Sequence, residues 1–329
     1  MKDKMKILVT GGAGYVGAVL VPELLNLGHH VTVLDLMIYG ESVLKKHPNL
    51  KKVCGDIRSQ SLVRDLMVDQ DVVMHLACIS NDPSFELNPS LGRSINLDPF
   101  EPMVKLAKNA GVSRFIYASS SSVYGVKSEP DVTEETSLEP LTDYSLFKVE
   151  CEKILARYTS EKFETVTIRP ATVCGYSPRQ RLDVVVNILT NLAFHKRSIS
   201  IFGGDQLRPN IHINDMVRVY LKILAAPSER VAGQTFNAGY ENHTVNELGN
   251  FVVDVIGNDV TVNQTPTDDN RSYHVSSLKL QEVLSFQTEF TISDAIKDLK
   301  NAFETGMLED PVNNELYFNI KRMQSLELR

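Results

Sequence analysis

The sequence has no tryptophan, only four cysteines and no long hydrophobic run. The cysteines, Cys54, Cys78, Cys151 and Cys174, form no C-x-x-C pair, and no histidine cluster has metal-ligand spacing, so we expect neither a disulfide framework nor a metal site. No segment approaches the roughly 20 apolar residues that span a bilayer. Residues 1–6 lack the apolar stretch of a signal peptide, so we expect a cytoplasmic protein that does not bind membranes.

A basic excess is also absent, because 41 Asp and Glu residues outnumber 34 Lys and Arg residues and give a net charge of −7. This balance argues against binding to nucleic acid and favours a small-molecule substrate. With 329 residues, of which 43% are hydrophobic, the chain can bury a sizeable core without disulfide support.

Short apolar runs alternate with helical patterns through the first half of the chain. The runs occupy residues 7–9, 30–34, 72–76 and 114–118. Such runs are typical of buried parallel strands joined by crossover helices. We therefore expect an α/β fold with a doubly wound parallel sheet.

The segment between the first strand and the first helix, residues 10–17, is rich in glycine. Gly12, Gly14 and Gly17 give the pattern G-x-G-x-x-G, and Gly11 adds the register G-x-x-G-x-x-G. Glycine lets the backbone approach a pyrophosphate, and the N-terminus of the following helix favours its negative charge. The sequence therefore predicts a Rossmann-type dinucleotide site.

Acidic residues near the ends of the next two strands indicate which dinucleotide binds. Asp35 ends the second strand, at the distance where a carboxylate bonds the adenosine ribose hydroxyls. No Lys or Arg follows until Lys45, so a 2′-phosphate would meet a carboxylate without a counter-charge, and NAD is favoured over NADP. Asp56 ends a plausible third strand, where it either contacts the adenine or caps a helix.

A second group of residues suits proton transfer. Tyr144 and Lys148 are four residues apart and therefore share one face of a helix. An ammonium group nearby favours the phenolate form of a tyrosine, which makes Tyr144 a candidate proton acceptor and donor. Four serines, residues 119–122, lie upstream at a strand end and offer hydroxyl groups to a substrate oxygen.

In this order, the motifs resemble the extended short-chain dehydrogenase/reductase family, specifically its nucleotide-sugar epimerases and dehydratases of the UDP-glucose 4-epimerase-like group. The resemblance covers about residues 5–300. The segment HLA at residues 75–77 resembles the end of the family's fourth strand, and Asn96 matches the asparagine of its next helix. The resemblance implies NAD as cofactor and the cofactor-binding residues Gly11, Gly14, Tyr15, Val16, Gly17, Asp35, Asp56, Ile57, Leu76, Ala77, Asn96, Tyr144, Lys148 and Pro170.

The family's catalytic set falls on Ser120, Tyr144 and Lys148, since the sequence VYG after the serines aligns Ser120 with the catalytic hydroxyl. The resemblance implies that Tyr144 removes a proton from a sugar hydroxyl while the same carbon is oxidised by NAD. It further implies that Ser120 shares the hydrogen bond and that Lys148 holds the nicotinamide ribose.

Two serines bear on the type of reaction. In 4,6-dehydratases an Asp-Glu pair follows the catalytic hydroxyl, whereas this chain has Ser121 and Ser122 there, which disfavours dehydration. We therefore expect an NAD-dependent nucleotide-sugar epimerase that acts through transient oxidation at C4. Two alternatives stay open. One is a nucleotide-sugar 4-dehydrogenase or reductase that releases a keto or hydroxy sugar, heptoses included; the other is an NAD-sensing regulatory protein.

The resemblance also places substrate-binding residues in the second half of the chain. Thr172 stands where the family carries a substrate-binding asparagine, and Arg208 and Arg271 resemble two diphosphate-binding arginines. Arg181 and Asn187 lie in a segment that resembles one in nucleotide-heptose dehydrogenases, and we expect both to face the substrate.

We expect residues 1–175 to form the NAD-binding domain, with segments of about 208–240 returning to it, and residues 176–329 to form mainly a smaller C-terminal substrate-binding region.

His212 is expected to be a packed structural residue. Residues past Leu308 show no clear pattern. The resemblance implies a homodimer packed through helices that include the one with the catalytic tyrosine.

Overall fold

A parallel sheet of seven strands forms the centre of the computed structural model, which describes residues 4–80, 82–127, 129, 131–267 and 274–326. Its strand order is β10-β6-β5-β4-β1-β2-β3, and every neighbouring pair is parallel. The four strands predicted from the apolar runs are confirmed. The seven strands are β1 (Lys6–Thr10), β2 (His30–Asp35), β3 (Leu50–Cys54), β4 (Val72–His75), β5 (Arg114–Ala118), β6 (Glu164–Pro170) and β10 (Thr235–Ala238).

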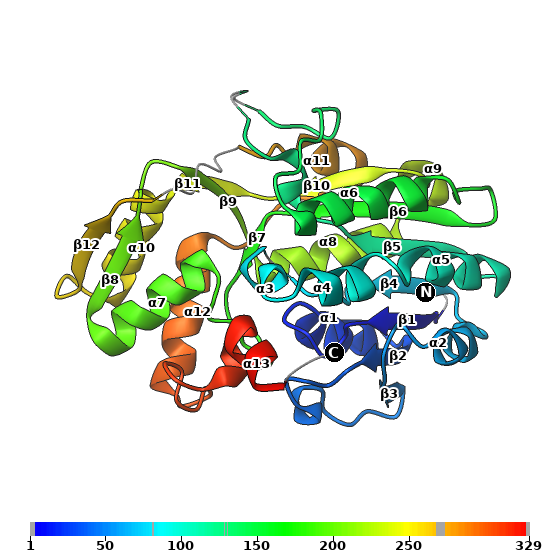
Figure 1. Ribbon diagram of the computed structural model, residues 1–329, viewed down its shortest axis with the longest axis horizontal. Helices are drawn as coiled ribbons and strands as arrows, with labels where there is room; N and C mark the ends of the chain where they lie inside the picture. Colours follow the sequence, from blue (N-terminus) through cyan, green and yellow to red (C-terminus); the bar gives the residue numbers. More distant parts are fainter. Residues whose placement is uncertain (1–3, 81, 128, 130, 268–273, 327–329) are drawn as a thin grey trace.

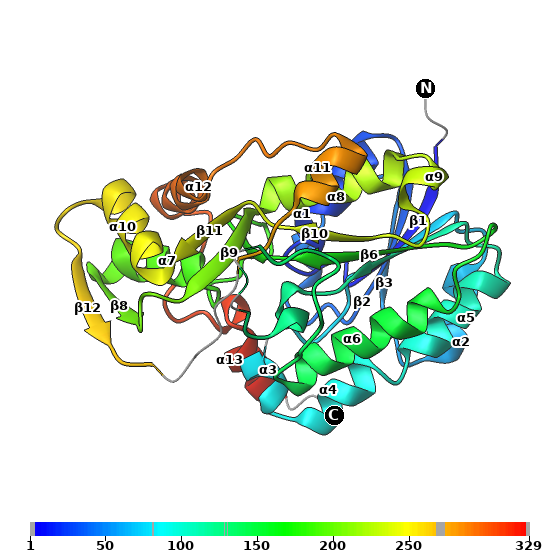
Figure 2. The same ribbon diagram turned by 90° about the horizontal axis from the view of Figure 1, so that it is seen from above.

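Helices cover both faces of this sheet (Figure 2). One face packs against α1 (Gly17–Asn26), α8 (Ile213–Ala225) and α11 (Leu278–Leu284), and the other against α2 (Gln60–Met67), α4 (Pro89–Asn96), α5 (Phe100–Asn109) and α6 (Asp143–Ala156). Each face has its own apolar cluster. The predicted Rossmann-type, doubly wound arrangement is therefore confirmed. The short helices α3 (Asp82–Glu86) and α9 (Ser228–Val231) pack against α6 and β6, respectively.

Strand register brings the predicted cofactor residues to one edge of the sheet. Thr10, the last residue of β1, is level with Leu34 of β2 and with His75 of β4. The chain segments that follow these strands therefore leave the sheet side by side. In an open α/β sheet, ligands bind outside this carboxyl edge.

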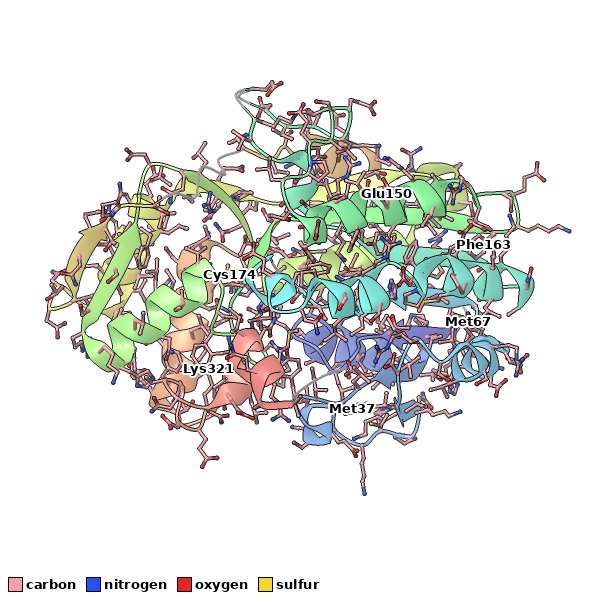
Figure 3. All side chains as sticks on the ribbon, in the orientation of Figure 1. Met37, Met67, Glu150, Phe163, Cys174 and Lys321 are labelled. Atoms are coloured by element: carbon pink, nitrogen blue, oxygen red, sulfur yellow. The ribbon has the colours of Figure 1, made fainter. Side chains whose placement is uncertain are left out.

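A second lobe lies beside the sheet and forms the left part of Figure 1. It contains the mutually packed helices α7 (Val185–Lys196), α10 (Val245–Ile256) and α12 (Ile292–Glu304) and the parallel strand pair β8 (Ser198–Phe202) and β12 (Thr261–Thr265). Its apolar cluster is separate from those of the sheet. A three-stranded sheet of β7 (Thr172–Cys174), β9 (Leu207–His212) and β11 (Glu241–Thr244) joins the two parts, and Cys174 marks this junction in Figure 3.

The second half of the chain thus contributes to both parts. Within the segment 208–240, helix α8 and strand β10 lie with the large sheet, whereas β9 belongs to the joining sheet. The C-terminal region, which showed no sequence pattern, contains a one-turn helix, η3 (Glu315–Tyr317), followed by α13 (Asn319–Leu326). Helix α13, red in Figure 1, lies between the second lobe and the N-terminal strands and packs against α3.

Candidate active site

A cavity of about 450 Å³ lies at the carboxyl edge of the large sheet, where the second lobe meets it. Most of the predicted site residues line it, namely Gly11, Gly14, Tyr15, Val16, Gly17, Asp35, Asp56, Ile57, Leu76, Ala77, Ser120, Tyr144, Pro170, Thr172, Arg181 and Arg208. Asn96, Lys148 and Asn187 are not part of its wall. The predicted substrate residue Arg271 lies outside the described residues.

The glycine loop provides a close-fitting wall for the cavity. Gly11 has a φ of +73°, and a Cβ atom there would lie 2.5 Å from the backbone nitrogen of Ala77. A Cβ on Gly17 would lie 2.5 Å from the carbonyl oxygen of Gly12. A Cβ on Gly12 would instead meet the side chain of Val33 in the core. Of the two glycine patterns, the one formed by Gly11, Gly14 and Gly17 therefore lines the cavity. Because these residues have no side chains, a pyrophosphate can approach their backbone closely.

Asp35 lies at the end of β2, beside the glycine loop. Its Oδ2 accepts a hydrogen bond from the Ala13 N–H at 3.0 Å, and its Oδ1 accepts one from the Met37 N–H at 2.8 Å. Burial raises the pKa of Asp35, and these two backbone donors counteract part of that rise. The remaining lone pairs of the carboxylate can accept the hydroxyls of a ribose.

Asp56 lies two residues beyond β3 and also lines the cavity. The alternative role as a helix cap is wrong, because Ser59 occupies the N-cap position of α2. Instead, both carboxylate oxygens bind Arg58, with 2.6 Å between Oδ2 and Nη2. Burial opposes ionisation of Asp56, but the hydrogen bonds from Arg58 outweigh it and lower the pKa of this carboxyl group.

Asn96 supports the cavity wall from behind. Its Oδ1 accepts the Ile79 N–H at 2.9 Å, and its Nδ2 donates to the Ile79 carbonyl at 3.0 Å. The side-chain amide thus pairs with the backbone of the loop that follows β4. The structure gives Asn96 a positioning role for Leu76 and Ala77, which lie on the cavity wall just before Ile79.

The serine segment turns sharply after β5. Ser120 is the N-cap of the one-turn helix η2 (Ser121–Tyr124), and its Oγ accepts hydrogen bonds from the N–H and the hydroxyl of Ser122 at 3.1 and 2.9 Å. Ser119 also lines the cavity, but its hydroxyl donates to Glu152 of α6. The Ser120 hydroxyl oxygen is therefore held at the cavity wall by Ser122.

Helix α6 carries the tyrosine and the lysine. It begins in a capping box, in which the Thr142 side chain accepts the Ser145 N–H and Ser145 Oγ accepts the Thr142 N–H. Tyr144 is therefore in the first helical turn, and Lys148 follows one turn later. Lys148 is buried and donates from Nζ to the Ala118 carbonyl at 2.6 Å, which ties α6 to the end of β5.

The charge on Lys148 is favoured even though the side chain is buried. Burial alone would lower its pKa, but interactions with Cys78 and Tyr144 outweigh this and raise it. The Lys148 ammonium lies 5.7 Å from the centroid of the Tyr144 ring. A stable positive charge beside the phenol is the arrangement that favours proton removal from it.

The side of the cavity where the predicted substrate residues lie is formed by the joining sheet and the loop that precedes α7. Thr172 and Arg208 come from β7 and β9, and both line the cavity. Arg181 also lines it and pairs with Asp183, with 2.6 Å between Nε and Oδ1. Asn187, by contrast, is fully buried and binds Gly175, the Arg181 carbonyl and the Tyr15 hydroxyl. The structure therefore does not bring Asn187 to the substrate side and uses it to hold this loop.

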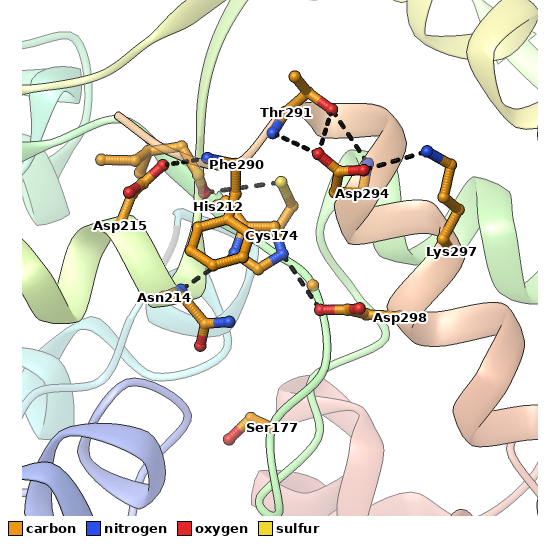
Figure 4. Close-up of polar contacts among 12 residues, drawn as sticks. Cys174, Ser177, His212, Asn214, Asp215, Phe290, Thr291, Asp294, Lys297 and Asp298 are labelled. Atoms are coloured by element: carbon orange, nitrogen blue, oxygen red, sulfur yellow. Dashed lines mark hydrogen bonds and ion pairs between the residues drawn. The ribbon is translucent and has the colours of Figure 1, made fainter. Parts of the chain in front are cut away.

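His212 is a packed structural residue, as predicted. Its side chain is fully buried and stacks on Phe290, and its Nδ1 accepts the Asn214 N–H at the start of α8 (Figure 4). Its Nε2 lies 3.3 Å from the Asp298 carboxylate, without the alignment of a hydrogen bond. The Cys174 thiol in the same region is buried and donates to a backbone carbonyl, so neither side chain lines the cavity.

The cavity wall also contains residues that were not predicted from the sequence, among them Tyr39, Arg179, Asn319 and Met323. Arg179 belongs to the same arginine-rich segment as Arg181, so its sequence position indicates a place near the cavity. No local pattern marks Asn319, which reaches the cavity only because α13 folds back over the chain.

In the described parts of the chain, no helix combines the length and apolar character that a membrane crossing requires. Nor do His, Cys, Asp or Glu side chains gather there in a group that could hold a metal ion.

Comparison with known proteins identifies the group to which this fold and site belong. Residues 7–239 match the NAD dependent epimerase/dehydratase family. The chain belongs to this family. It is 32% identical over 273 residues to an uncharacterized UDP-glucose epimerase, YtcB, of Bacillus subtilis, covering 78% of this chain and 84% of the relative. It is 28% identical over 305 residues to a dTDP-glucose 4,6-dehydratase of Streptomyces griseus, covering 88% and 91% of the two chains.

A solved structure shares both the fold and a cofactor. The UDP-glucuronic acid 4-epimerase of Bacillus cereus, in complex with UDP-glucuronic acid and NAD, is similar with a TM-score of 0.82 and 25% identity, over 92% of this chain and 99% of that one. NAD is therefore the cofactor of this epimerase/dehydratase, and the bare glycine backbone beside Asp35 fits it.

We predict that Gly11→Ala weakens NAD binding by at least about tenfold, because its Cβ would push the loop of Leu76 and Ala77 out of the cavity wall. Gly111→Ala is the matched control, since Gly111 also has a positive φ, of +84°, but nothing lies within 4 Å of an added Cβ. Both variants should lose about 1–2 kcal/mol of stability to backbone strain. Calorimetric titration with NAD checks the difference, and equal affinities of the two variants would contradict it.

Proposed function

We propose that this enzyme is a nucleotide-sugar epimerase that inverts a secondary alcohol at C4 through transient oxidation. The observation that carries the proposal is the distribution of charge around the cavity. Among the described residues that line it, the only carboxylates are Asp35, which ends β2, and Asp56, which lies two residues beyond β3. Around Ser120 and Tyr144 the wall offers hydroxyl and guanidinium groups instead.

This distribution disfavours dehydration. Elimination of water from a keto sugar needs an acid and a base besides the groups that oxidise the alcohol. The positions after Ser120 carry Ser121 and Ser122, and the Ser122 hydroxyl is bound to Ser120. Asp183 is the nearest carboxylate in the loop of Arg181, and it is neutralised by that arginine and is not part of the wall.

The proposed reaction begins with proton removal by Tyr144. The phenolate oxygen of Tyr144 accepts the proton of the sugar C4 hydroxyl. The Ser120 hydroxyl donates a hydrogen bond to the sugar oxygen that loses this proton. Lys148 keeps a positive charge beside the phenolate. When bound, NAD supplies the two-electron acceptor and donor for the carbon. The proton returns from Tyr144 to the sugar oxygen when the opposite face of the ketone is reduced.

We expect purified enzyme to interconvert the C4 epimers of a UDP- or dTDP-linked hexose. The reaction should be run in deuterated water and followed by nuclear magnetic resonance and mass spectrometry. Because the same hydride leaves and returns, the inverted carbon should gain no solvent deuterium. Substantial deuterium at C4 would overturn direct hydride return. Steady accumulation of reduced nicotinamide would favour the alternative dehydrogenase, and NAD binding without any turnover would favour the regulatory protein.

Substitution of the proposed base provides a separate prediction. Tyr144→Phe should lower kcat by about 10²- to 10⁴-fold, the usual contribution of general acid–base catalysis. NAD affinity should change less than about threefold, since the aromatic ring and its packing are retained. Tyr158→Phe is the matched control, because its hydroxyl binds Glu101 at the surface, away from the cavity. A Tyr144→Phe enzyme with an unchanged rate would remove Tyr144 from the mechanism.

We also propose that the enzyme is a homodimer that packs through helices including α6. Leu146, on the first turn of α6, has 41% of its surface exposed, and packing of α6 against a second copy of the chain would cover it. Light scattering should give the mass of two chains, and Leu146→Glu should shift it toward one. A monomeric mass for the unmodified enzyme would contradict this proposal.

A further inference from the structure

Two arginines lie on the cavity wall in the loop between β7 and α7. Arg179 is 4% exposed, and the side chain of Arg181 is 12% exposed. Each has one buried N–H group without a hydrogen-bond partner, Nε in Arg179 and Nη2 in Arg181. A buried guanidinium with an unused donor costs free energy unless a ligand completes it.

The two arginines differ in how their charge is balanced. Arg181 pairs with Asp183 and also donates to the Ser80 hydroxyl at 3.2 Å. Arg179 forms no salt bridge with any described residue. Its partners are the Asn319 side-chain oxygen, 2.6 Å from Nη2, and the ring of Tyr39, whose centroid lies 3.5 Å from Cζ. Arg179 thus has no carboxylate in direct contact, although Asp35 and Asp183 lie near enough to interact with its charge.

The loop of Arg179 is fixed against the glycine loop. The Tyr15 hydroxyl donates to the Gly175 carbonyl at 2.6 Å, and the Ser177 hydroxyl donates to the Tyr15 carbonyl at 2.8 Å. Tyr39, which the guanidinium covers, lies four residues after Asp35. Arg179 thus lies on the cavity wall, in a loop that contacts the glycine loop, and covers a residue just beyond the end of β2.

The C-terminal helix holds Arg179 in this place. Asn319, the first residue of α13, accepts from both Arg179 and the Tyr39 hydroxyl, and its Nδ2 donates to Ser80 at 3.0 Å. Its backbone N–H donates to Asp183 at 2.8 Å. Arg322, one turn later, donates to the Ile38 carbonyl at 2.6 Å.

We propose that Arg179 is a binding residue for the diphosphate of NAD, reaching it from the side opposite the glycine loop, and that Asn319 is its positioning residue. A guanidinium can bind phosphate oxygens bidentately, and the Nε–H group of Arg179 has no other hydrogen-bond partner. The nucleotide sugar also carries a diphosphate. The position of Arg179 near Asp35 and over Tyr39, at the end of β2, favours the cofactor, whereas Arg181 binds Ser80 and interacts with Tyr144.

The test uses nucleotide-free protein and measures binding rather than turnover. Arg179→Gln should weaken NAD and ADP-ribose binding by about 10- to 100-fold, as the loss of a charge-assisted pair of hydrogen bonds predicts. Adenosine, which lacks the diphosphate, should lose less than about twofold. NAD affinity should also become less sensitive to salt. Arg64→Gln, an exposed arginine on α2, is the matched control and should bind all three ligands normally.

Two outcomes would overturn the proposal. Equal losses of affinity for adenosine and ADP-ribose would assign Arg179 a structural role. Weaker binding of UDP-glucose with unchanged NAD binding would assign the arginine to the substrate diphosphate. None of these measurements depends on whether the enzyme is an epimerase, so failure here is distinct from failure of the proposed reaction.

Asn319→Asp tests the positioning role with little change of shape. It places a carboxylate against the Arg179 guanidinium, which should neutralise the charge and weaken NAD binding about as much as Arg179→Gln. Thermal unfolding without NAD should show a midpoint no lower than that of the unmodified enzyme. Unchanged NAD affinity in a well-folded Asn319→Asp protein would overturn the positioning role.

Discussion

The active-site cavity depends on a buried hydrogen-bond junction between the glycine loop and the second lobe. The Tyr15 hydroxyl donates to the Gly175 carbonyl and accepts from Asn187, which in turn accepts the Gly175 N–H. These groups are buried, so a displacement of either part would leave several polar atoms unsatisfied at a cost of about 1–3 kcal/mol each. The junction therefore fixes the distance between the cofactor half and the substrate half of the cavity.

A second buried network fixes the catalytic helix to the sheet. Glu152 of α6 accepts hydrogen bonds from Ser119 and from Arg169 of β6, and Lys148 donates to the Ala118 carbonyl. These contacts connect α6 to the ends of β5 and β6. The position of Tyr144 relative to Ser120 thus follows from the sheet, as the proposed role of Tyr144 as a proton acceptor requires.

How far the sequence predicted this site depends on how local each feature is. The glycine register, Asp35 and the pair of Tyr144 and Lys148 belong to short motifs with fixed spacing. The structure places Gly11, Gly14, Gly17, Asp35 and Tyr144 on the wall of one cavity, with Lys148 one helical turn behind Tyr144. The roles of Asn96 and Asn187 required knowledge of their partners. Both side-chain amides bind backbone groups of neighbouring loops. Residue type and sequence position alone do not show whether an asparagine binds the backbone or a ligand.

The C-terminal helix lies at the other extreme. Asn319 binds Tyr39, 280 residues earlier in the chain, and nothing in the sequence near either residue indicates this pairing. The contact exists only because the second lobe returns the chain to the end of β2. Features that close a cavity between two parts of a fold are in general non-local, whereas features that contact the cofactor backbone are local. This difference explains why the C-terminal segment showed no pattern although it completes the site.

The proposed reaction and the proposed role of Arg179 support one another in physical terms. An epimerase oxidises and reduces the same sugar, so its cofactor does not have to leave between the two half-reactions. A dehydrogenase that releases its product must exchange the reduced cofactor in every cycle. Contacts that hold the dinucleotide from both sides, with α13 fixing Arg179 opposite the glycine loop, slow dissociation without slowing turnover only in the first case. A cofactor enclosed in this way suits hydride return to the sugar that supplied it.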